Sequence, residues 1–129
     1  MREIEFRGKD KTGIMYKDWF YGSLDLTTNP EFPTILCKDK FDNVMHIQVD
    51  KETIGQYIGL NDNCKQKVFE GDIMQDPFDP DEVFVVDFID GEFVLLNDVN
   101  VIVDIEQVHF LNIIGNIHDN KEFYKSEDN

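Results

Sequence analysis

Alanine is absent from this 129-residue chain, and cysteine and long apolar runs are scarce. Because alanine is the best helix former, its absence disfavours long helices. Only Cys37 and Cys64 are present, without a Cys-x-x-Cys pattern, so we expect reduced thiols and neither a structural metal nor another cofactor. No apolar run of about 18 residues occurs and no signal peptide is recognisable, so neither membrane insertion nor secretion is predicted.

Basic residues are also few, with 12 Lys and Arg against 27 Asp and Glu and a formal net charge of −15. Nucleic-acid affinity comes largely from basic side chains that release counterions, so direct binding to nucleic acid is not expected. The same argument disfavours anionic membranes. The acidity is interpreted either as a solubilising surface or as an acidic face that imitates nucleic acid or docks on a basic partner.

Aromatic residues, in contrast, are plentiful, with 11 Phe, 4 Tyr and 1 Trp. They favour strands over helices. Trp19, Phe20 and Tyr21 are adjacent, and we consider two roles for them: anchoring a small core, which is the commoner use, or forming a partner-binding surface.

Short strands separated by turn residues are predicted along most of the chain. The ranges are 2–7, 14–16, 34–37, 44–49, 83–88, 92–96, 101–105 and 108–114, with a short helix over 121–124. Asp-Gly at 90–91 predicts a tight hairpin between two of these strands. Residues 76–82 are predicted to form a solvated acidic loop, because their spacing does not match a calcium-binding loop.

The stretch 53–74 has the most specific local pattern. Gly55 and Gly59 interrupt a strand-like run and predict a curved strand, and short polar residues at 61–65 predict a turn. In Glu70-Gly71-Asp72 we expect Gly71 to adopt a backbone angle that other residues resist. The Asp72 carboxylate can accept hydrogen bonds from N–H groups of that turn.

Four ordered motifs resemble the YopX family of phage and prophage proteins: REIEFRGKD at 2–10, TIGQYIGLND at 53–62, VFEGDIM at 68–74 and IIGNIHDN at 113–120. The resemblance implies a phage or prophage origin, and with the reduced thiols expected from the cysteine usage we predict a location in the cytoplasm of the bacterial host. It implies no catalytic residue, because the family is described as uncharacterised. The residues it marks as structural are Gly55, Gln56, Tyr57, Gly59, Glu70, Gly71, Asp72, Gly115 and Asn116.

The predicted fold is all-β, with short antiparallel strands. We expect residues 68–118 in the C-terminal half to form a small SH3-like barrel within a YopX-like core over 53–129. Residues 1–52 would form a second set of strands packed on the barrel, although the whole chain could also be a single domain.

The sequence contains no recognisable Ser-His-Asp triad, glycine-rich phosphate loop or distinctive carboxylate pair. We therefore consider three hypotheses for its function. The preferred one is a non-enzymatic phage or prophage accessory protein that binds a phage or host protein. The alternative is an acidic nucleic-acid mimic that inhibits a host DNA- or RNA-binding protein. The third is a hydrolase whose site assembles only in three dimensions. Sheet edges also lead us to expect a homo-oligomer.

Overall fold

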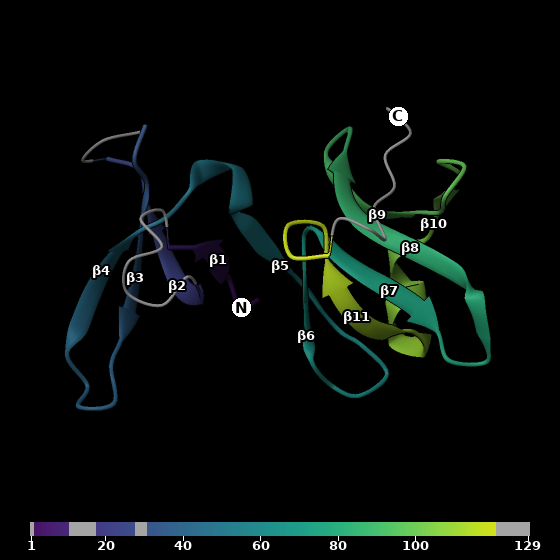
Figure 1. The fold of residues 1–129 in the computed structure, drawn as a ribbon, viewed down its shortest axis with the longest axis horizontal. Helices are drawn as coiled ribbons and strands as arrows, with labels where there is room; N and C mark the ends of the chain where they lie inside the picture. The colour runs from purple at the N-terminus through teal and green to yellow at the C-terminus, as the bar shows by residue number, and fades with distance from the viewer. Residues whose placement is uncertain (1, 11–17, 28–30, 121–129) are drawn as a thin grey trace. The chain divides into compact units, whose positions relative to one another are not determined.

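The structure, a computed structural model, describes residues 2–10, 18–27 and 31–120. The chain divides into unit 1, Met1–Tyr57, and unit 2, Ile58–Asn129, and the division falls inside strand β5 (Gly55–Asn61). Both units contain antiparallel sheet (Figure 1), so the predicted all-β class is confirmed. The predicted division after residue 52 stays a prediction.

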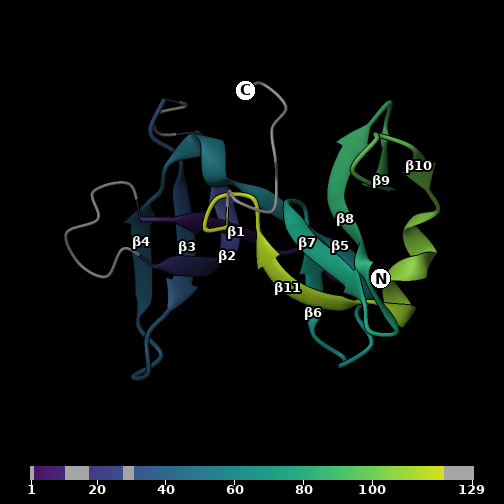
Figure 2. The same ribbon diagram turned by 45° about the vertical axis from the view of Figure 1, so that its right-hand side comes forward.

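Unit 1 contains a sheet with the strand order β4-β3-β2-β1-β5 (Figure 2). The strands before β5 are β1 (Phe6–Lys9), β2 (Trp19–Asp25), β3 (Thr34–Lys38) and β4 (Val44–Gln48). A single 3₁₀ turn, η1 (Lys51–Thr53), leads into β5, and the Asp50 side chain caps it by accepting a hydrogen bond from Glu52 N. β4 is therefore the edge strand of this sheet.

Burial in unit 1 follows the two-residue period of its strands. Ile35 on β3 and Val49, just beyond β4, are fully buried. Along β4 the alternation is as predicted: Met45 and Ile47 are half-buried, whereas the exposed residues are Val44, His46 and Gln48. The predicted strands over 34–37 and 44–49 are thus confirmed within one residue at each end.

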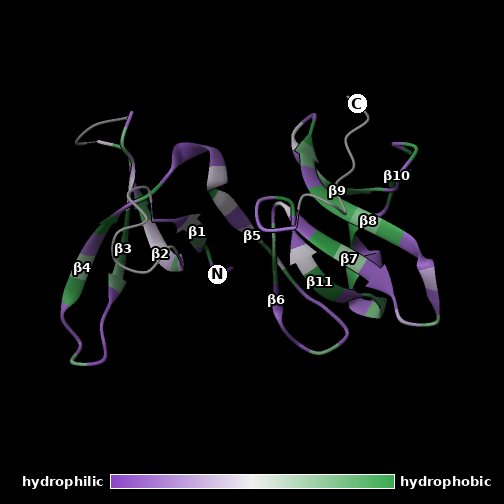
Figure 3. Ribbon diagram, viewed as in Figure 1, coloured by the Kyte–Doolittle hydropathy of each residue, from purple (hydrophilic) through white to green (hydrophobic). Residues whose placement is uncertain are grey.

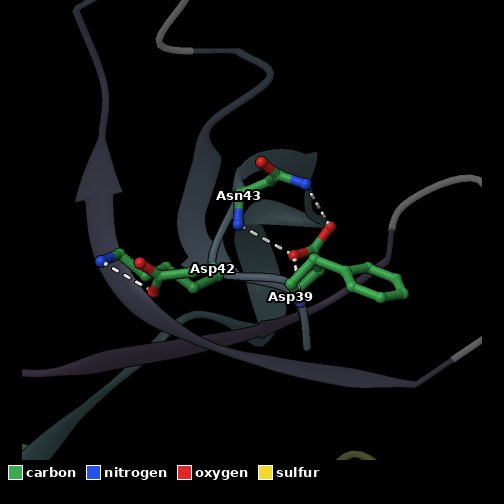
Figure 4. A network of polar contacts seen from close by, with 5 residues as sticks. Asp39, Asp42 and Asn43 are labelled. Atoms are coloured by element: carbon green, nitrogen blue, oxygen red, sulfur yellow. Dashed lines mark hydrogen bonds and ion pairs between the residues drawn. The ribbon is translucent and has the colours of Figure 1, made fainter.

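The hairpin that joins β3 to β4 is held by Asp39 (Figure 4). Its Oδ1 accepts hydrogen bonds from Phe41 N at 2.8 Å and Asn43 N at 2.9 Å. Asp42 has a φ of 70°, an angle that Asp tolerates better than most residues. The hydrogen bonds from Asn43 and Phe41 to the carboxylate hold the pKa of Asp39 below its ordinary value.

Unit 2 contains the rest of β5, its neighbour β6 (Lys67–Phe69) and a sheet with the order β10-β9-β8-β7-β11. The strands of that sheet are β7 (Asp72–Asp76), β8 (Asp79–Ile89), β9 (Glu92–Leu96), β10 (Ile102–Val103) and β11 (Asn112–Asn116). Figure 3 shows hydrophobic residues along much of β8. The buried core consists of Val68, Met74, Phe84, Val86, Leu95, Val108 and Leu111.

The predicted hairpin between β8 and β9 is confirmed. Ile89 lies opposite Glu92, and Asp90 and Gly91 form the turn with φ values of 52° and 86°. Two consecutive positive φ angles match the twist of a two-residue hairpin, which explains why Asp-Gly is so informative there.

The prediction of a loop over 76–82 was wrong in its second half, because β8 begins at Asp79. Asp79 lies opposite Asp76, so only Pro77 and Phe78 connect the two strands. Asp76 Oδ1 accepts a hydrogen bond from Phe78 N at 2.9 Å and stabilises this short turn. The segment is nonetheless solvated, since all residues from 77 to 82 are exposed.

The predicted strands over 101–105 and 108–114 were also partly wrong. β10 contains only two residues, and Ile105–Phe110 forms a 3₁₀ helix, η2. The Asp104 side chain accepts a hydrogen bond from Glu106 N at 3.0 Å and caps η2. This N-cap stabilises a helical turn in a segment whose branched apolar residues favour a strand.

At the N-terminus the sheet begins later than predicted. Residues 2–5 are not part of a strand, β1 starts at Phe6, and Ile4 is 60% exposed. The ladders to β2 and β5 begin at Phe6, although Glu5 O still accepts a hydrogen bond from Tyr57 N. The predicted strand over 14–16 and helix over 121–124 lie outside the described residues.

The SH3-like barrel over 68–118 stays a prediction. Within the part of the chain that the structure describes, β10 and β11 are the two ends of an open five-stranded order, and their pairings do not close it into a barrel.

Candidate functional site

The three adjacent aromatics point to both faces of the unit 1 sheet. Across the β1–β2 ladder, Lys9 lies opposite Trp19 and Arg7 lies opposite Tyr21. Residues that lie opposite each other share a face, and successive residues alternate between faces. The structure therefore groups Trp19 and Tyr21 with two basic residues and places Phe20 on the other face.

Trp19 contacts both basic neighbours. The guanidinium carbon of Arg7 lies 4.6 Å from the centre of the Trp19 ring, and Lys9 Nζ lies 5.9 Å from it. Cation–π contacts of this kind contribute about 0.5–2 kcal/mol, and the contribution is larger where the contact is shielded from solvent. Since Arg7 is only 5% exposed, the contact anchors the sheet, whereas Tyr21 is 44% exposed.

The first two sequence motifs meet in unit 1. Phe6 and Arg7 of β1 lie opposite Gln56 and Gly55 of β5, and Tyr57 N donates a hydrogen bond to Glu5 O at 2.8 Å. Gly55 and Tyr57 are buried. These motif residues thus join strands that lie far apart in the sequence.

Asp62, the last residue of the second motif, is a structural centre of unit 2 that the analysis of single motifs missed. It is 5% exposed, and its Oδ1 accepts hydrogen bonds from Cys64 N and Gln66 N, each at 2.8 Å. Its Oδ2 accepts a third bond from Ile113 N at 3.1 Å. The polar residues at 61–65 predicted the local turn around Asp62. They did not indicate its hydrogen bond to the backbone of β11. Near it, Gly59 has a φ of 90°.

The Glu70-Gly71-Asp72 turn has the predicted geometry. Gly71 has a φ of 90°, and Asp72, 2% exposed, accepts a hydrogen bond from Phe69 N through Oδ2 at 2.8 Å. Glu70 is half-buried beside them. Gly71 also receives a hydrogen bond from Ile117 N at 2.9 Å, which connects the third motif to the fourth.

The fourth motif folds back on Asn116. Asn116 Oδ1 accepts hydrogen bonds from His118 N at 3.0 Å and Asp119 N at 2.9 Å, while Asn116 N donates to Asn120 Oδ1 at 3.1 Å. A Cβ at Gly115 would collide with the Asn120 amide, so only glycine fits there without a shift. Like the third motif, this one builds a turn.

Among the described residues, no group of three or more His, Cys, Asp or Glu side chains could hold a metal ion. Burial raises the pKa of the Cys37 thiol, and turn hydrogen bonds lower the pKa of Asp39. Neither shift arises from a second ionisable group, whereas paired titratable groups with displaced pKa values are typical of acid–base sites. Cys37 and Cys64 are free thiols.

Three exposed apolar residues lie close together in the sequence at strand β10 in unit 2. Val99 is 68% exposed, Val101 is 53% exposed and Ile102 is 58% exposed, and acidic residues flank them at Asp98 and Asp104. We call Val99, Val101 and Ile102 the β10 patch. An apolar centre with a charged margin is the usual anatomy of a protein–protein contact.

Charge is divided unequally between the units. Unit 1 has 8 Lys and Arg against 10 Asp and Glu, a net charge of −2, whereas unit 2 has 4 against 17, a net charge of −13. The surplus of acid in the chain is therefore almost entirely a property of unit 2.

A sequence model described as YopX protein matches residues 5–125. The chain belongs to the YopX family. A crystal structure of protein EF1440 from Enterococcus faecalis is similar to it, with a TM-score of 0.60 and 18% identity, over 97% of this chain and 100% of the other. At that identity the likeness shows the fold alone. No curated protein is significantly similar to the chain.

The YopX match covers nearly all of the four motifs, and the structure explains them as joints between strands. Within the described residues, no helix is long and apolar enough to cross a membrane. Among the features that these joints do not explain are the β10 patch, the exposed Tyr21 and the charge of unit 2.

Proposed function

We propose that this YopX protein is a non-enzymatic phage or prophage accessory protein that binds another protein in the bacterial cytoplasm. The observation that carries the proposal is the β10 patch. Fully burying one large apolar side chain is worth about 1.5–3 kcal/mol, so three neighbouring ones supply a useful binding centre. We also propose that residues 68–118 of unit 2 form the SH3-like barrel predicted from the sequence.

A second candidate is a nucleic-acid mimic that inhibits a basic host protein, and the net charge of −13 in unit 2 favours it. A surface of one sign attracts a partner of the other over about one Debye length, roughly 10 Å at 0.1 M salt. Binding of this kind weakens steeply as salt is added. Binding centred on the β10 patch does not, because burial of apolar surface is not screened.

Affinity capture from a bacterial lysate at low and high salt tests both candidates. We expect the wild-type protein to retain its partner at high salt. The Val101→Asp, Ile102→Asp double variant should capture less partner by about tenfold or more, since one buried charge costs several kcal/mol. Phe78→Asp is the matched control, because Phe78 is 95% exposed but lies on the β7–β8 turn.

Capture that disappears at high salt and survives the double variant would favour the mimic instead. Capture of nothing at either salt concentration would contradict both candidates and leave the hydrolase as the hypothesis to pursue.

A further inference from the structure

The β10 patch begins on a turn that is fixed by its own hydrogen bonds. Asn97 N donates to Val101 O at 3.2 Å, and Asn100 N donates to Asn97 O at 3.0 Å. The Asn97 side chain reinforces the turn, because its Oδ1 accepts hydrogen bonds from Val99 N at 3.0 Å and Val101 N at 2.9 Å. Asn100 has a φ of 61°, as expected for a three-residue hairpin loop that ends in a left-handed residue. Such a preformed turn loses little conformational entropy when a partner binds to it.

Unit 1 contains a turn of the same kind between β3 and β4 (Figure 4). Asp39 takes the place of Asn97, and its Oδ1 likewise accepts hydrogen bonds from the N–H groups two and four residues later. Asp42, with a φ of 70°, takes the place of Asn100. The two turns can therefore be compared position by position, counted from the Asp or Asn that begins each of them.

Both turns expose apolar side chains at the same two positions. Two residues after the first residue of the turn, Phe41 is 73% exposed in unit 1 and Val99 is 68% exposed in unit 2. Five residues after it, Val44 is 55% exposed and Ile102 is 58% exposed. Exposed apolar surface therefore does not distinguish the turn of unit 2 from that of unit 1.

Charge does distinguish the two turns. The second residue of the turn is Lys40 in unit 1, where its Nζ lies 5.4 Å from the centre of the Phe41 ring, but it is Asp98 in unit 2. Lys38 also directly precedes the turn of unit 1. Residues 68–120 of unit 2, in contrast, include 13 Asp and Glu and no Lys or Arg. The turn of unit 2 thus combines exposed apolar side chains with a margin of negative charge alone.

We propose that the β10 patch binds a basic amphipathic segment of its partner protein, in which apolar side chains are bordered by Lys or Arg. This inference rests on the proposed protein-binding function and assigns a partner chemistry to that site. The apolar side chains of the segment contact Val99 and Ile102, and its cations lie beside Asp98 and Asp104, which are both exposed. Apolar burial supplies the affinity, while the opposite charges attract the segment and select it over neutral or acidic ones.

Other occupants match the patch less well. A second copy of this chain would have a net charge of −15, and like charges that meet across an interface cost affinity. Nucleic acid is disfavoured by the same repulsion, since its phosphates require basic side chains. Within the chain, the turn of unit 1 has the same backbone and similar apolar exposure, so it serves as the control for the effect of charge.

Two synthetic peptides test the chemistry of the partner. Both are fluorescein-labelled helices with the same leucine stripe, and they carry either Lys or Glu at every polar position. In fluorescence anisotropy with the full-length protein, we expect the Lys peptide to bind about tenfold or more tightly than the Glu peptide.

Substitution by serine tests the apolar part of the contact without a change in charge. The double variant Val99→Ser, Ile102→Ser should bind the Lys peptide about tenfold or more weakly than wild type, because the contact loses apolar area. The matched double variant Phe41→Ser, Val44→Ser on the turn of unit 1 should bind it like wild type. All four side chains are exposed, so both variants should melt at the temperature of the wild-type protein.

Exchange of one charge tests the margin. Asp98→Lys should weaken binding of the Lys peptide by about threefold or more and strengthen binding of the Glu peptide. The turn accommodates lysine at this position, because Lys40 occupies it in unit 1. Lys40→Asp is the matched control and should leave the affinity for both peptides unchanged.

Equal affinity for the two peptides would overturn the proposed partner chemistry. Full retention of Lys-peptide binding by the serine variant of unit 2 would also overturn it, since charge alone would then attract the peptide, as expected for a nucleic-acid mimic. A third contrary result is self-association of the wild type, seen in sedimentation velocity, that this variant lacks, because a second copy would then cover the patch. Capture from a lysate through Val101 and Ile102 does not depend on the charge of the partner, so the two proposals can fail separately.

Discussion

At the scale of single residues, Gly71 makes the clearest demand on the backbone. Its φ of 90° lies in the region that L-residues avoid, and its carbonyl accepts the hydrogen bond from Ile117 N. Gly71→Ala should therefore destabilise the protein by about 1–2 kcal/mol in denaturant unfolding. Gly71→Asn is the matched control and should lose less, because Asn tolerates positive φ. Equal losses for both variants would contradict this explanation.

Asp62 should matter more than its place in a polar turn indicates. Removal of its carboxylate in Asp62→Ala leaves three backbone N–H groups, of Cys64, Gln66 and Ile113, without their acceptor. We expect a loss of about 1–3 kcal/mol in the free energy of unfolding.

Two variants serve as comparisons for Asp62→Ala. Asp62→Asn keeps one carbonyl oxygen and should have an intermediate effect. Asp76→Ala removes a carboxylate that caps Phe78 N on an exposed turn, and it should change stability by about 0.5 kcal/mol or less. A larger effect at Asp76 than at Asp62 would show that the buried joint is not important.

At the scale of elements, the β3–β4 hairpin should respond to acid through Asp39. Hydrogen bonds from Asn43 and Phe41 lower the pKa of this carboxyl in the folded state. Its contribution to stability is therefore present above the unfolded pKa and is lost as pH falls through the lowered folded pKa. In an NMR titration, the Asp39 carboxyl should titrate below 3.8, its ordinary value.

Loss of the Asp39 interactions should also appear locally. Exchange of the Phe41 and Asn43 amide protons should accelerate as Asp39 becomes protonated, and Asp39→Asn should remove that dependence on pH. A carboxyl that titrates at or above the ordinary pKa would show that the turn does not depend on this charge.

At the scale of the whole molecule, the net charge of −15 should make stability depend on salt. Most of this charge lies in unit 2, where exposed acids follow each other at Asp79, Asp81 and Glu82. Because salt screens repulsion between exposed charges, we expect the melting temperature to rise between about 20 mM and 500 mM NaCl.

A variant with fewer acids checks the source of that effect. The double variant Asp79→Asn, Asp81→Asn should melt at a higher temperature than wild type in low salt. Its melting temperature should rise less than that of wild type when salt is added. A melting temperature that falls with NaCl would mean that attractive ion pairs outweigh repulsion.

The sequence by itself determined the features that depend on neighbouring residues. The all-β class follows from alternation and aromatic content, the turn at Asp90-Gly91 from two residues that accept positive φ, and the angle of Gly71 from its immediate context. Where prediction failed locally, a short-range cap had been overlooked, as at Asp104 before η2.

Tertiary structure alone decided which distant groups meet. Nothing local indicates that Asp62 accepts a hydrogen bond from Ile113 N, or that Trp19 packs over Arg7 while Phe20 lies on the other face. The place of β4 at the end of its sheet is likewise a consequence of strand order. Local patterns report backbone preference and side-chain alternation, whereas strand order depends on the free energy of the whole sheet, to which residues far apart in sequence contribute.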